Sequence, residues 1–142
     1  MAVHWLIYMS RPEAAPWPAT ILDIARPSER RNARAGVSGM LMFSDNFYLQ
    51  YLEGRQKSVT GVWRRVSGDP RHRIDWVLRG EAETPRMGAL PLGFFDADRE
   101  HSSAQGTPLW RARHAWPKEC AEALIEMLAL IAREKYPTAM GG

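Results

Sequence analysis

The sequence predicts an α/β (α+β) fold with a ferredoxin-like βαββαβ core, in which a five-stranded mixed sheet carries two helices on one face and C-terminal helices on the other. Three observations support this prediction. Apolar runs of strand length alternate with segments of helical periodicity, the strands are apolar on both sides, and a long amphipathic segment follows the last strand. With 142 residues, 45% of them hydrophobic, the chain is long enough for one domain with a substantial core.

The chain is expected to begin with a strand and a helix. Residues 3–9 form a compact apolar run that ends at turn residues, and within it Leu6 and Tyr8 should point to the same face of the sheet. A helix should begin at Pro18. Pro27 should end or bend this helix, because proline has no backbone N–H to donate.

A β-hairpin is expected next. Residues 37–44 and 47–53 are both strand-like and apolar. Only Asp45 and Asn46 separate them, and these two residue types favour the tight turn that joins antiparallel strands.

The rest of the chain should complete the sheet and cover its second face. A second helix follows from an apolar stripe at positions i, i+3, i+4 and i+7, formed by Val59, Val62, Trp63 and Val66. Residues 74–78 and 90–95 are the fourth and fifth expected strands. A strong amphipathic helix over residues 117–136, with a short helix near residues 98–104, should pack on the face opposite the first two helices.

Composition narrows the classes of function. Cys120 is the only cysteine, which excludes an internal disulfide and a cysteine-built zinc site. The net charge of +3 is too small to require a nucleic-acid partner, and no apolar run is long enough for a membrane span. No leader segment opens the chain, so we expect a cytoplasmic protein. The histidines show no metal-ligand spacing, no Ser/His/Asp arrangement or phosphate loop is apparent, and we expect neither a metal site nor an enzyme.

One buried polar residue is unexpected in so apolar a strand. Gln50 lies among Tyr48, Leu49, Tyr51 and Leu52, and a buried amide needs hydrogen-bond partners. In a ferredoxin-like sheet the first and third strands are adjacent and central. Tyr8 can therefore reach Gln50 from the same face, either as a structural hydrogen bond or as part of a site.

Further polar candidates lie near the two helices. Asn32 precedes the second strand, where it is either a turn residue or an amide that pairs with a ligand. Arg65, Asp69 and His72 surround the end of the second helix. The arginine and histidine are suited to phosphate and the aspartate to a ribitol or ribose hydroxyl, although such residues also form ordinary solvated surfaces.

Four segments, taken in order and at their spacing, resemble the BLUF family of FAD-binding blue-light sensors. They are residues 6–10, 31–39, 49–54 and 69–73. The resemblance covers about residues 3–95, and residues 116–120 with the helix after them look like the C-terminal cap of short, stand-alone members. It implies that residues 1–96 form a flavin-binding domain and that residues 97–142 form a helical extension on the opposite sheet face.

The resemblance also implies a set of residues that bind FAD. It places Ile24 and Val66 on the two faces of the flavin ring and the polar side chains around its edge and phosphates. The complete set is Tyr8, Ile24, Arg31, Asn32, Gln50, Arg65, Val66, Asp69 and His72.

A photochemical mechanism without substrate turnover follows from the resemblance. Tyr8 would give an electron and a proton to the excited flavin and take them back, while Gln50 rotates or tautomerises. Stronger hydrogen bonding to the flavin would then shift its absorption to the red.

The signalling segment departs from the family pattern. Family members often carry Trp-x-Met early in the fifth strand, whereas this chain has Leu90-Pro91-Leu92. The resemblance therefore implies that Leu90 and Leu92 occupy the relay positions without the usual side chains. The signal is expected to reach a downstream protein partner of unknown identity, and self-association into a homo-oligomer is also expected.

Three alternatives remain open from the sequence. The fold could belong to a protein-interaction module without flavin. A colourless purified protein would favour this alternative. An acylphosphatase-like hydrolase would use Arg11 and Asn32, although no matching phosphate loop is present. An RNA-binding sheet would stack bases on Phe47, Tyr48 or Tyr51, but the strand lacks the interleaved basic and glycine residues.

Overall fold

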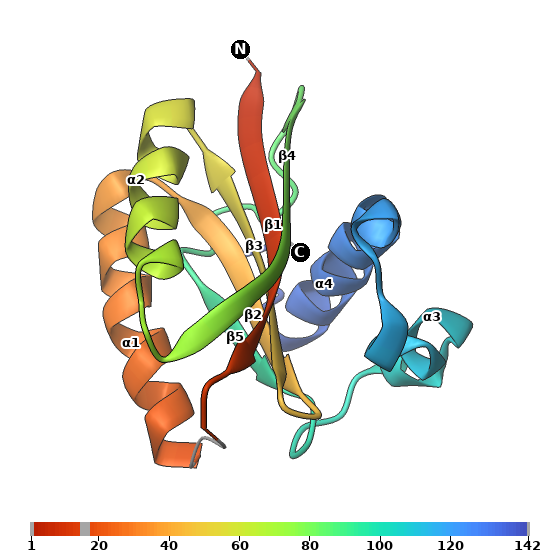
Figure 1. The fold of residues 1–142 in the computed structure, drawn as a ribbon. Helices are drawn as coiled ribbons and strands as arrows, with labels where there is room; N and C mark the ends of the chain where they lie inside the picture. The colour runs from red at the N-terminus through yellow and green to blue at the C-terminus, as the bar shows by residue number, and fades with distance from the viewer. Residues whose placement is uncertain (1, 15–17, 142) are drawn as a thin grey trace.

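A five-stranded sheet forms the middle layer of the protein, with helices on both faces (Figure 1). The computed structural model describes residues 2–14 and 18–141, without the side chains of residues 18–21. In chain order its strands and α-helices are β1 (Val3–Pro12), α1 (Pro18–Ala35), β2 (Ser38–Ser44), β3 (Phe47–Gly54), α2 (Gln56–Ser67), β4 (His72–Ala82), β5 (Gly93–Asp96), α3 (Pro108–Arg111) and α4 (Ala121–Lys135). Short 3-10 turns at Ser103–Gly106, Arg113–Ala115 and Lys118–Cys120 lie between β5 and α4.

The strand order β4-β1-β3-β2-β5 confirms the predicted mixed sheet. The β1–β3, β1–β4 and β2–β3 pairs are antiparallel, and β5 runs parallel to β2. As expected, β1 and β3 are adjacent, and their register places Tyr8 directly opposite Gln50. The hairpin turn is also confirmed. Asp45 and Asn46 both have positive φ angles, 46° and 65°, which the tight turn between twisted strands requires.

The two faces of the sheet are covered by different helices, as predicted. Helices α1 and α2 lie side by side on one face, and α4 lies on the other (Figure 1). Trp5, Ile7 and Met9 of β1 pack with Leu124 and Leu128 of α4 in one large hydrophobic core. Leu6 and Tyr8 point to the opposite face, toward α2. Strands β1, β2 and β3 therefore bury side chains on both sides, which explains their continuous apolar runs, whereas β4 alternates between half-buried and exposed residues.

Helix α1 does not end at Pro27, which was one of the two predicted outcomes, because it continues through the proline to Ala35. Ala25 and Asn32, on either side of the proline, are both buried. Packing on the sheet therefore carries the helix past a residue that would weaken it in isolation. The hydroxyl of Ser28 donates to the Ile24 carbonyl, 2.9 Å away, and adds a local hydrogen bond beside the proline.

The predicted fifth strand and the predicted C-terminal helix are both shorter than expected. Strand β5 begins at Gly93, so Leu90 and Leu92 precede it instead of forming its start. Pro91 between them has no N–H for a strand ladder, and the backbone N–H of Leu90 is used in a turn to the Met87 carbonyl. The last α-helix begins at Ala121, because the residues before it form a 3-10 turn. The helical segment expected near residues 98–104 is realised as the turn at Ser103–Gly106 and α3.

Replacement of a core leucine in α4 should test how strongly this helix supports the sheet. Leu128 is fully buried, so Leu128→Ala should lower the free energy of unfolding by about 2–5 kcal/mol through lost burial and a cavity. Urea unfolding followed by circular dichroism would measure this. The matched control is Leu22→Ala in α1, because Leu22 is 41% exposed. Equal losses in the two variants would contradict the shared core of α4 and the sheet.

Candidate functional site

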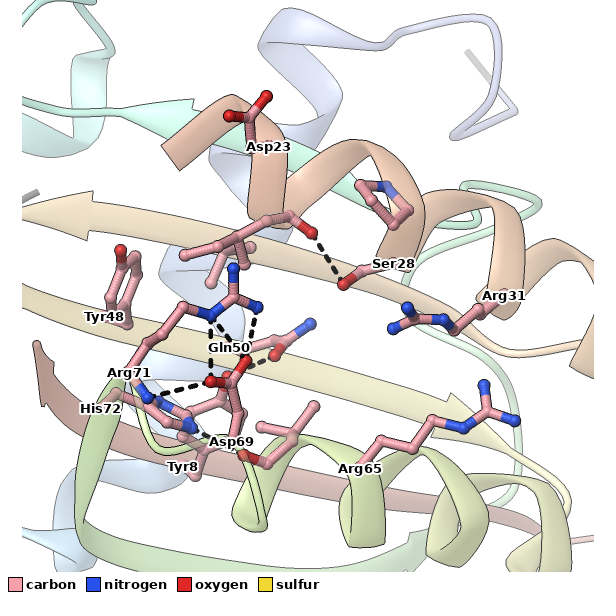
Figure 2. Close-up of a pocket in the computed structure, with 14 residues that line it drawn as sticks. Tyr8, Asp23, Ser28, Arg31, Tyr48, Gln50, Arg65, Asp69, Arg71 and His72 are labelled. Atoms are coloured by element: carbon pink, nitrogen blue, oxygen red, sulfur yellow. Dashed lines mark hydrogen bonds and ion pairs between the residues drawn. The ribbon is translucent and has the colours of Figure 1, made fainter. Parts of the chain in front are cut away.

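The face of the sheet under α1 and α2 carries two separate hydrophobic clusters instead of one continuous core. The cluster under α1 consists of Ala25, Leu41, Phe43, Tyr48 and Leu92. The cluster under α2 consists of Leu6, Tyr8, Val37, Leu52 and Val59. A compact domain usually fills such a face continuously. Here a cavity of about 280 Å³ opens between the two helices, with Tyr8 and Gln50 in its lining (Figure 2).

Tyr8 and Gln50 form a hydrogen-bonded pair that is shielded from solvent. The Tyr8 hydroxyl donates to Gln50 Oε1 at 2.5 Å, and each residue is only 3% exposed. Burial raises the pKa of Tyr8 well above its ordinary value, and the nearby Tyr48 and Asp69 raise it further. The phenol therefore keeps its proton at neutral pH and acts as the donor in this pair.

The Gln50 amide connects the pair to the cavity. Because Oε1 accepts from Tyr8, the NH₂ group lies on the side away from the phenol (Figure 2). No described residue accepts a hydrogen bond from this NH₂ group. The NH₂ group is not among the fully buried side-chain atoms that lack a partner, so it is open to the cavity, and the arrangement is suited to a polar atom of a ligand there.

Ile24 from α1 and Val66 from α2 line the cavity, together with Leu41 from the sheet. Both helix residues are partly buried against the neighbouring clusters. Pro27 also lines the cavity, and without an N–H it presents an apolar ring there. The middle of the cavity is therefore suited to a flat apolar group held between two helices.

Asn32 is almost completely buried, with 1% of its surface exposed. Its amide Nδ2 donates to the Pro91 carbonyl at 2.8 Å, and its backbone carbonyl accepts from the Val37 N–H. It also lines a small adjoining cavity of about 20 Å³, which Gln50 lines too. Asn32 thus ties α1 to the segment before β5 and lies beside the Gln50 amide.

Two arginines line the opening of the cavity, one from each helix. Arg31 and Arg65 are both exposed, and neither forms an ion pair with a described residue. Figure 2 shows both guanidinium groups on the same side of the cavity. Planar guanidinium groups bind phosphate through two parallel hydrogen bonds, so this side is suited to an anionic ligand group.

Asp69 and Arg71 form an ion pair at the other end of the cavity. Arg71 Nη2 lies 2.5 Å from Asp69 Oδ2, and the Arg71 backbone N–H also donates to the carboxylate. Hydrogen bonding from Arg71 lowers the pKa of the Asp69 carboxyl. Asp69 lines the cavity as predicted, but its carboxylate is already paired with an arginine that sequence reasoning missed. The i to i+2 spacing, typical of an Asx turn, was the available signal.

His72 lines the cavity, but both of its ring nitrogens are engaged within the protein. Nε2 donates to the Val66 carbonyl at 2.6 Å, and Nδ1 lies within hydrogen-bond distance of the Ser10 hydroxyl, at 2.8 Å. The ring also packs edge-on against Tyr8, at 5.9 Å between centroids. In this geometry His72 fixes the end of α2 to β1 and has no free nitrogen for a phosphate.

Two of the alternative functions disagree with the structure. Phe47, Tyr48 and Tyr51 are no more than 5% exposed, so the strand offers no open platform for stacking RNA bases. Arg11 pairs with Asp75, and Asn32 is buried against Pro91. These contacts leave no phosphate-cradling pair of the acylphosphatase type.

The comparison with protein families decides the identity. Residues 3–87 match the family model described as BLUF, sensors of blue light using FAD. The chain belongs to the BLUF family. It is therefore a blue-light sensor that uses FAD, and the matched region is a sensory domain and not an enzyme.

Individual relatives support this assignment. The chain is 36% identical over 85 residues to the photoactivated adenylate cyclase subunit beta of Euglena longa, covering 58% of this chain and 10% of that protein. It is 32% identical over 92 residues to the blue light- and temperature-regulated antirepressor BluF of Escherichia coli, covering 64% of this chain and 23% of that protein. The chain thus spans about a tenth of the cyclase subunits and about a quarter of the antirepressor.

Solved structures show the same fold over most of the chain. The dark-state structure of BlrB, a BLUF protein, has a TM-score of 0.71 at 26% identity and covers 89% of this chain and 95% of its own. The ground state of BlsA has a TM-score of 0.76 at 19% identity, with 92% and 89% covered. At that identity the second match supports the fold alone.

The sequence-predicted BLUF site residues come together in the structure. Eight of the nine line the main cavity, and the ninth, Asn32, lines the adjoining one. Leu92 belongs to the cluster beside the cavity, whereas Leu90 lies in the core under α4. The cavity-lining residues that sequence reasoning did not assign are Asp23, Pro27, Ser28, Leu41, Tyr48 and Arg71. Tyr48 could have been found by parity, because it lies two positions before Gln50 on the same face.

The described residues contain neither a candidate metal site nor a helix that could span a membrane. Within residues 2–14 and 18–141, no three His, Cys, Asp or Glu side chains are grouped closely enough to hold a metal ion. Among the described helices, none combines the length and apolarity that crossing a membrane requires.

The raised pKa of Tyr8 predicts a specific dependence of stability on pH. The unfolded phenol loses its proton above about pH 10, while the buried phenol keeps it, so the unfolded state binds fewer protons. The contribution of Tyr8 is therefore complete below pH 10 and is lost as pH rises above it. Tyr8→Phe should make the fall in the free energy of unfolding shallower, by about 0.7 kcal/mol per pH unit on average between pH 9 and 11, because the unfolded phenol is only partly ionised in that range. Chemical denaturation between pH 9 and 11 would measure this, and an unchanged slope would show that Tyr8 titrates normally.

Proposed function

We propose that FAD binds with its flavin ring in the cavity between α1 and α2, and that Tyr8 and Gln50 form the photoactive centre. The observation that carries this proposal is the buried hydrogen bond from the Tyr8 hydroxyl to Gln50 Oε1. The NH₂ group of the same Gln50 amide lies beside the cavity and has no acceptor among the described residues. A sensor that changes hydrogen bonding without turning over substrate needs such a pair, because it must be shielded from water and able to exchange donor and acceptor roles.

The residues present fit a flavin. The cavity of about 280 Å³ is slightly smaller than ordinary ligand pockets, which span about 300–1,000 Å³, so it is suited to a ring system with the remainder of FAD extending outward. Ile24 and Val66 would contact the two faces of the ring, and the amides of Gln50 and Asn32 would meet its polar edge. Arg31 and Arg65 would then hold the phosphates, while Asp69 and His72 would complete the wall of the site.

The mechanism relies on the donor and acceptor roles of this chain's side chains. Bound FAD supplies the absorption of blue light and, when excited, the capacity to accept an electron and a proton. Tyr8 would donate the electron, and its oxidised phenol, a strong acid, would pass its proton along the existing hydrogen bond to Gln50 Oε1. Gln50 Nε2 would release one of its own protons toward the cavity, which leaves the amide as its neutral imidic-acid tautomer. When Tyr8 recovers its electron and proton, Gln50 can remain rotated or tautomerised, because each arrangement satisfies its neighbours.

Relay of the signal is proposed to involve the segment around Leu90 and Leu92. Asn32 holds the carbonyl of Pro91, and the two leucines belong to the cores on opposite faces of the sheet. A change at the Gln50 amide would therefore reach both faces through neighbouring contacts. We also propose that residues 1–96 form the FAD-binding domain and residues 97–142 a helical extension, since the cavity is lined only by residues 8–72.

The recipient of the signal is proposed to be another protein. The relatives include an antirepressor and cyclase subunits, so related BLUF domains occur in proteins with different outputs. Homo-oligomerisation stays a prediction. The apolar area expected on the last helix is absent from its described surface, and the large hydrophobic side chains found exposed among the described residues are Leu22 and Val77. A cytoplasmic location and the absence of a nucleic-acid partner also stay predictions.

Replacement of Tyr8 should separate FAD binding from photochemistry. Tyr8→Phe keeps the ring but removes the electron-donating hydroxyl, so the protein should bind FAD and show no light-induced red shift. A light-minus-dark absorption spectrum measures this. Tyr51→Phe is the matched control, because Tyr51 is the neighbour of Gln50 on β3 but faces α4, and the red shift of this variant should persist. A normal shift in Tyr8→Phe would contradict the proposed centre, and a colourless wild-type protein that refuses added FAD would favour a flavin-free interaction module.

Replacement of Arg31 and Arg65 should weaken the binding of FAD by removing contacts to its phosphates. The double variant Arg31→Gln, Arg65→Gln should bind FAD about tenfold more weakly, because charge-assisted hydrogen bonds are lost. Its affinity for riboflavin, which has no phosphate, should be unchanged. Fluorescence titration of both ligands would measure this, with Arg64→Gln as a control that removes the neighbouring exposed charge. An equal loss for FAD and riboflavin would place the phosphates elsewhere.

A further inference from the structure

The positive charge of the protein is concentrated on α1 and α2. These two helices carry seven arginine or lysine residues and two aspartate or glutamate residues. Because the whole chain has 19 basic and 16 acidic residues, the remainder has 12 and 14 and is net negative. The small net charge of +3 therefore hides a strongly basic face on the side of the flavin cavity.

Three arginines of α1 form an exposed row along the helix. Arg26, Arg30 and Arg34 are spaced four residues apart, so they lie on one face and span about 12 Å. All three are exposed, and none forms an ion pair or side-chain hydrogen bond with a described residue. The sequence outside the described residues contains no aspartate or glutamate. None of the three lines the cavity, so FAD binding does not account for them.

The arginine row does not stabilise the helix that carries it. Like charges four residues apart repel each other, and the row contains two such pairs. Asp23 and Glu29 lie three residues from Arg26, but neither carboxylate is within ion-pair distance of it. The helix dipole favours a cation in the last turn, which accounts for Arg34 but not for Arg26 or Arg30. An external partner with negative charge would relieve this repulsion.

We infer that the Arg26–Arg30–Arg34 row is a docking surface for an acidic segment of a partner protein. A helix with carboxylates at every fourth position has the same spacing of about 6 Å, so each guanidinium could pair with one carboxylate in the two-bond geometry. The short length of the row and the net negative remainder of the chain favour such a segment over nucleic acid, which would need a longer basic track. The opposite edge of α1 lines the cavity through Ile24 and Ser28, so a docked partner would contact the helix beside the photoactive pair.

This inference extends the proposed function by identifying the chemistry of the partner, and the binding itself does not require photochemistry. The test uses the full chain loaded with FAD and a fluorescein-labelled helical peptide with glutamate at every fourth position. Anisotropy titration at about 0.15 M ionic strength would compare wild type with Arg26→Gln, Arg30→Gln, Arg34→Gln. The matched control is Arg111→Gln, Lys118→Gln, Arg133→Gln, which removes three exposed cations elsewhere.

We expect the row variant to lose about tenfold or more in peptide affinity and the control variant to bind like wild type. Both variants should keep the light-induced red shift, so a failure of the photochemical proposal would be recognised separately. Absence of peptide binding by wild type, or equal losses in the two variants, would overturn the inference. Tighter binding of a duplex DNA of the same charge, lost in the row variant alone, would overturn it in favour of a nucleic-acid surface.

Discussion

The hydrogen bond between Tyr8 and Gln50 is the constraint on which the organisation of the site depends. Both residues lie in the central strands of the sheet, opposite each other in register, and both are closed to solvent. A buried phenol and amide are tolerated only when their hydrogen-bonding groups have partners. Tyr8 satisfies the amide oxygen, and the remaining amide donor lies beside the cavity. A ligand in the cavity can therefore complete the hydrogen bonds of the pair.

The two faces of the sheet divide the structural and functional roles. The face under α4 is filled by one continuous core, which includes the side chains of β1 and β3 that alternate with Tyr8 and Gln50. The opposite face has two clusters with the cavity between them. Stability is thus concentrated on one side, and the other side can leave a gap for a ligand. This division explains why strands that look uniformly apolar in sequence carry a functional site.

Helix α1 combines several roles at different positions around its axis. Ala25 and Asn32 anchor it to the sheet, Ile24 lines the cavity, and the exposed row of arginines faces solvent. A movement of the residues beside Gln50 would be transmitted to the same helix that carries this row of arginines. Helix α2 is held from its end by His72, which bonds to the carbonyl of Val66 and to Ser10 of β1. The walls of the cavity are therefore attached to the strands that carry the photoactive pair.

The sequence by itself determined the order of the elements, the hairpin turn, the parity of β1 and the meeting of Tyr8 with Gln50. The first three depend on periodicity and on local backbone preferences, which neighbouring residues specify. The meeting of Tyr8 with Gln50 follows from the strand order of the ferredoxin-like sheet, which the order of the elements predicts. Only the tertiary structure decided that α1 passes through Pro27, that Arg71 neutralises Asp69 and that His72 has no free nitrogen. It also decided that Leu90 and Leu92 precede β5 and belong to different cores. Each of these outcomes depends on packing or pairing against segments distant in the chain, and local residue preferences do not contain that information.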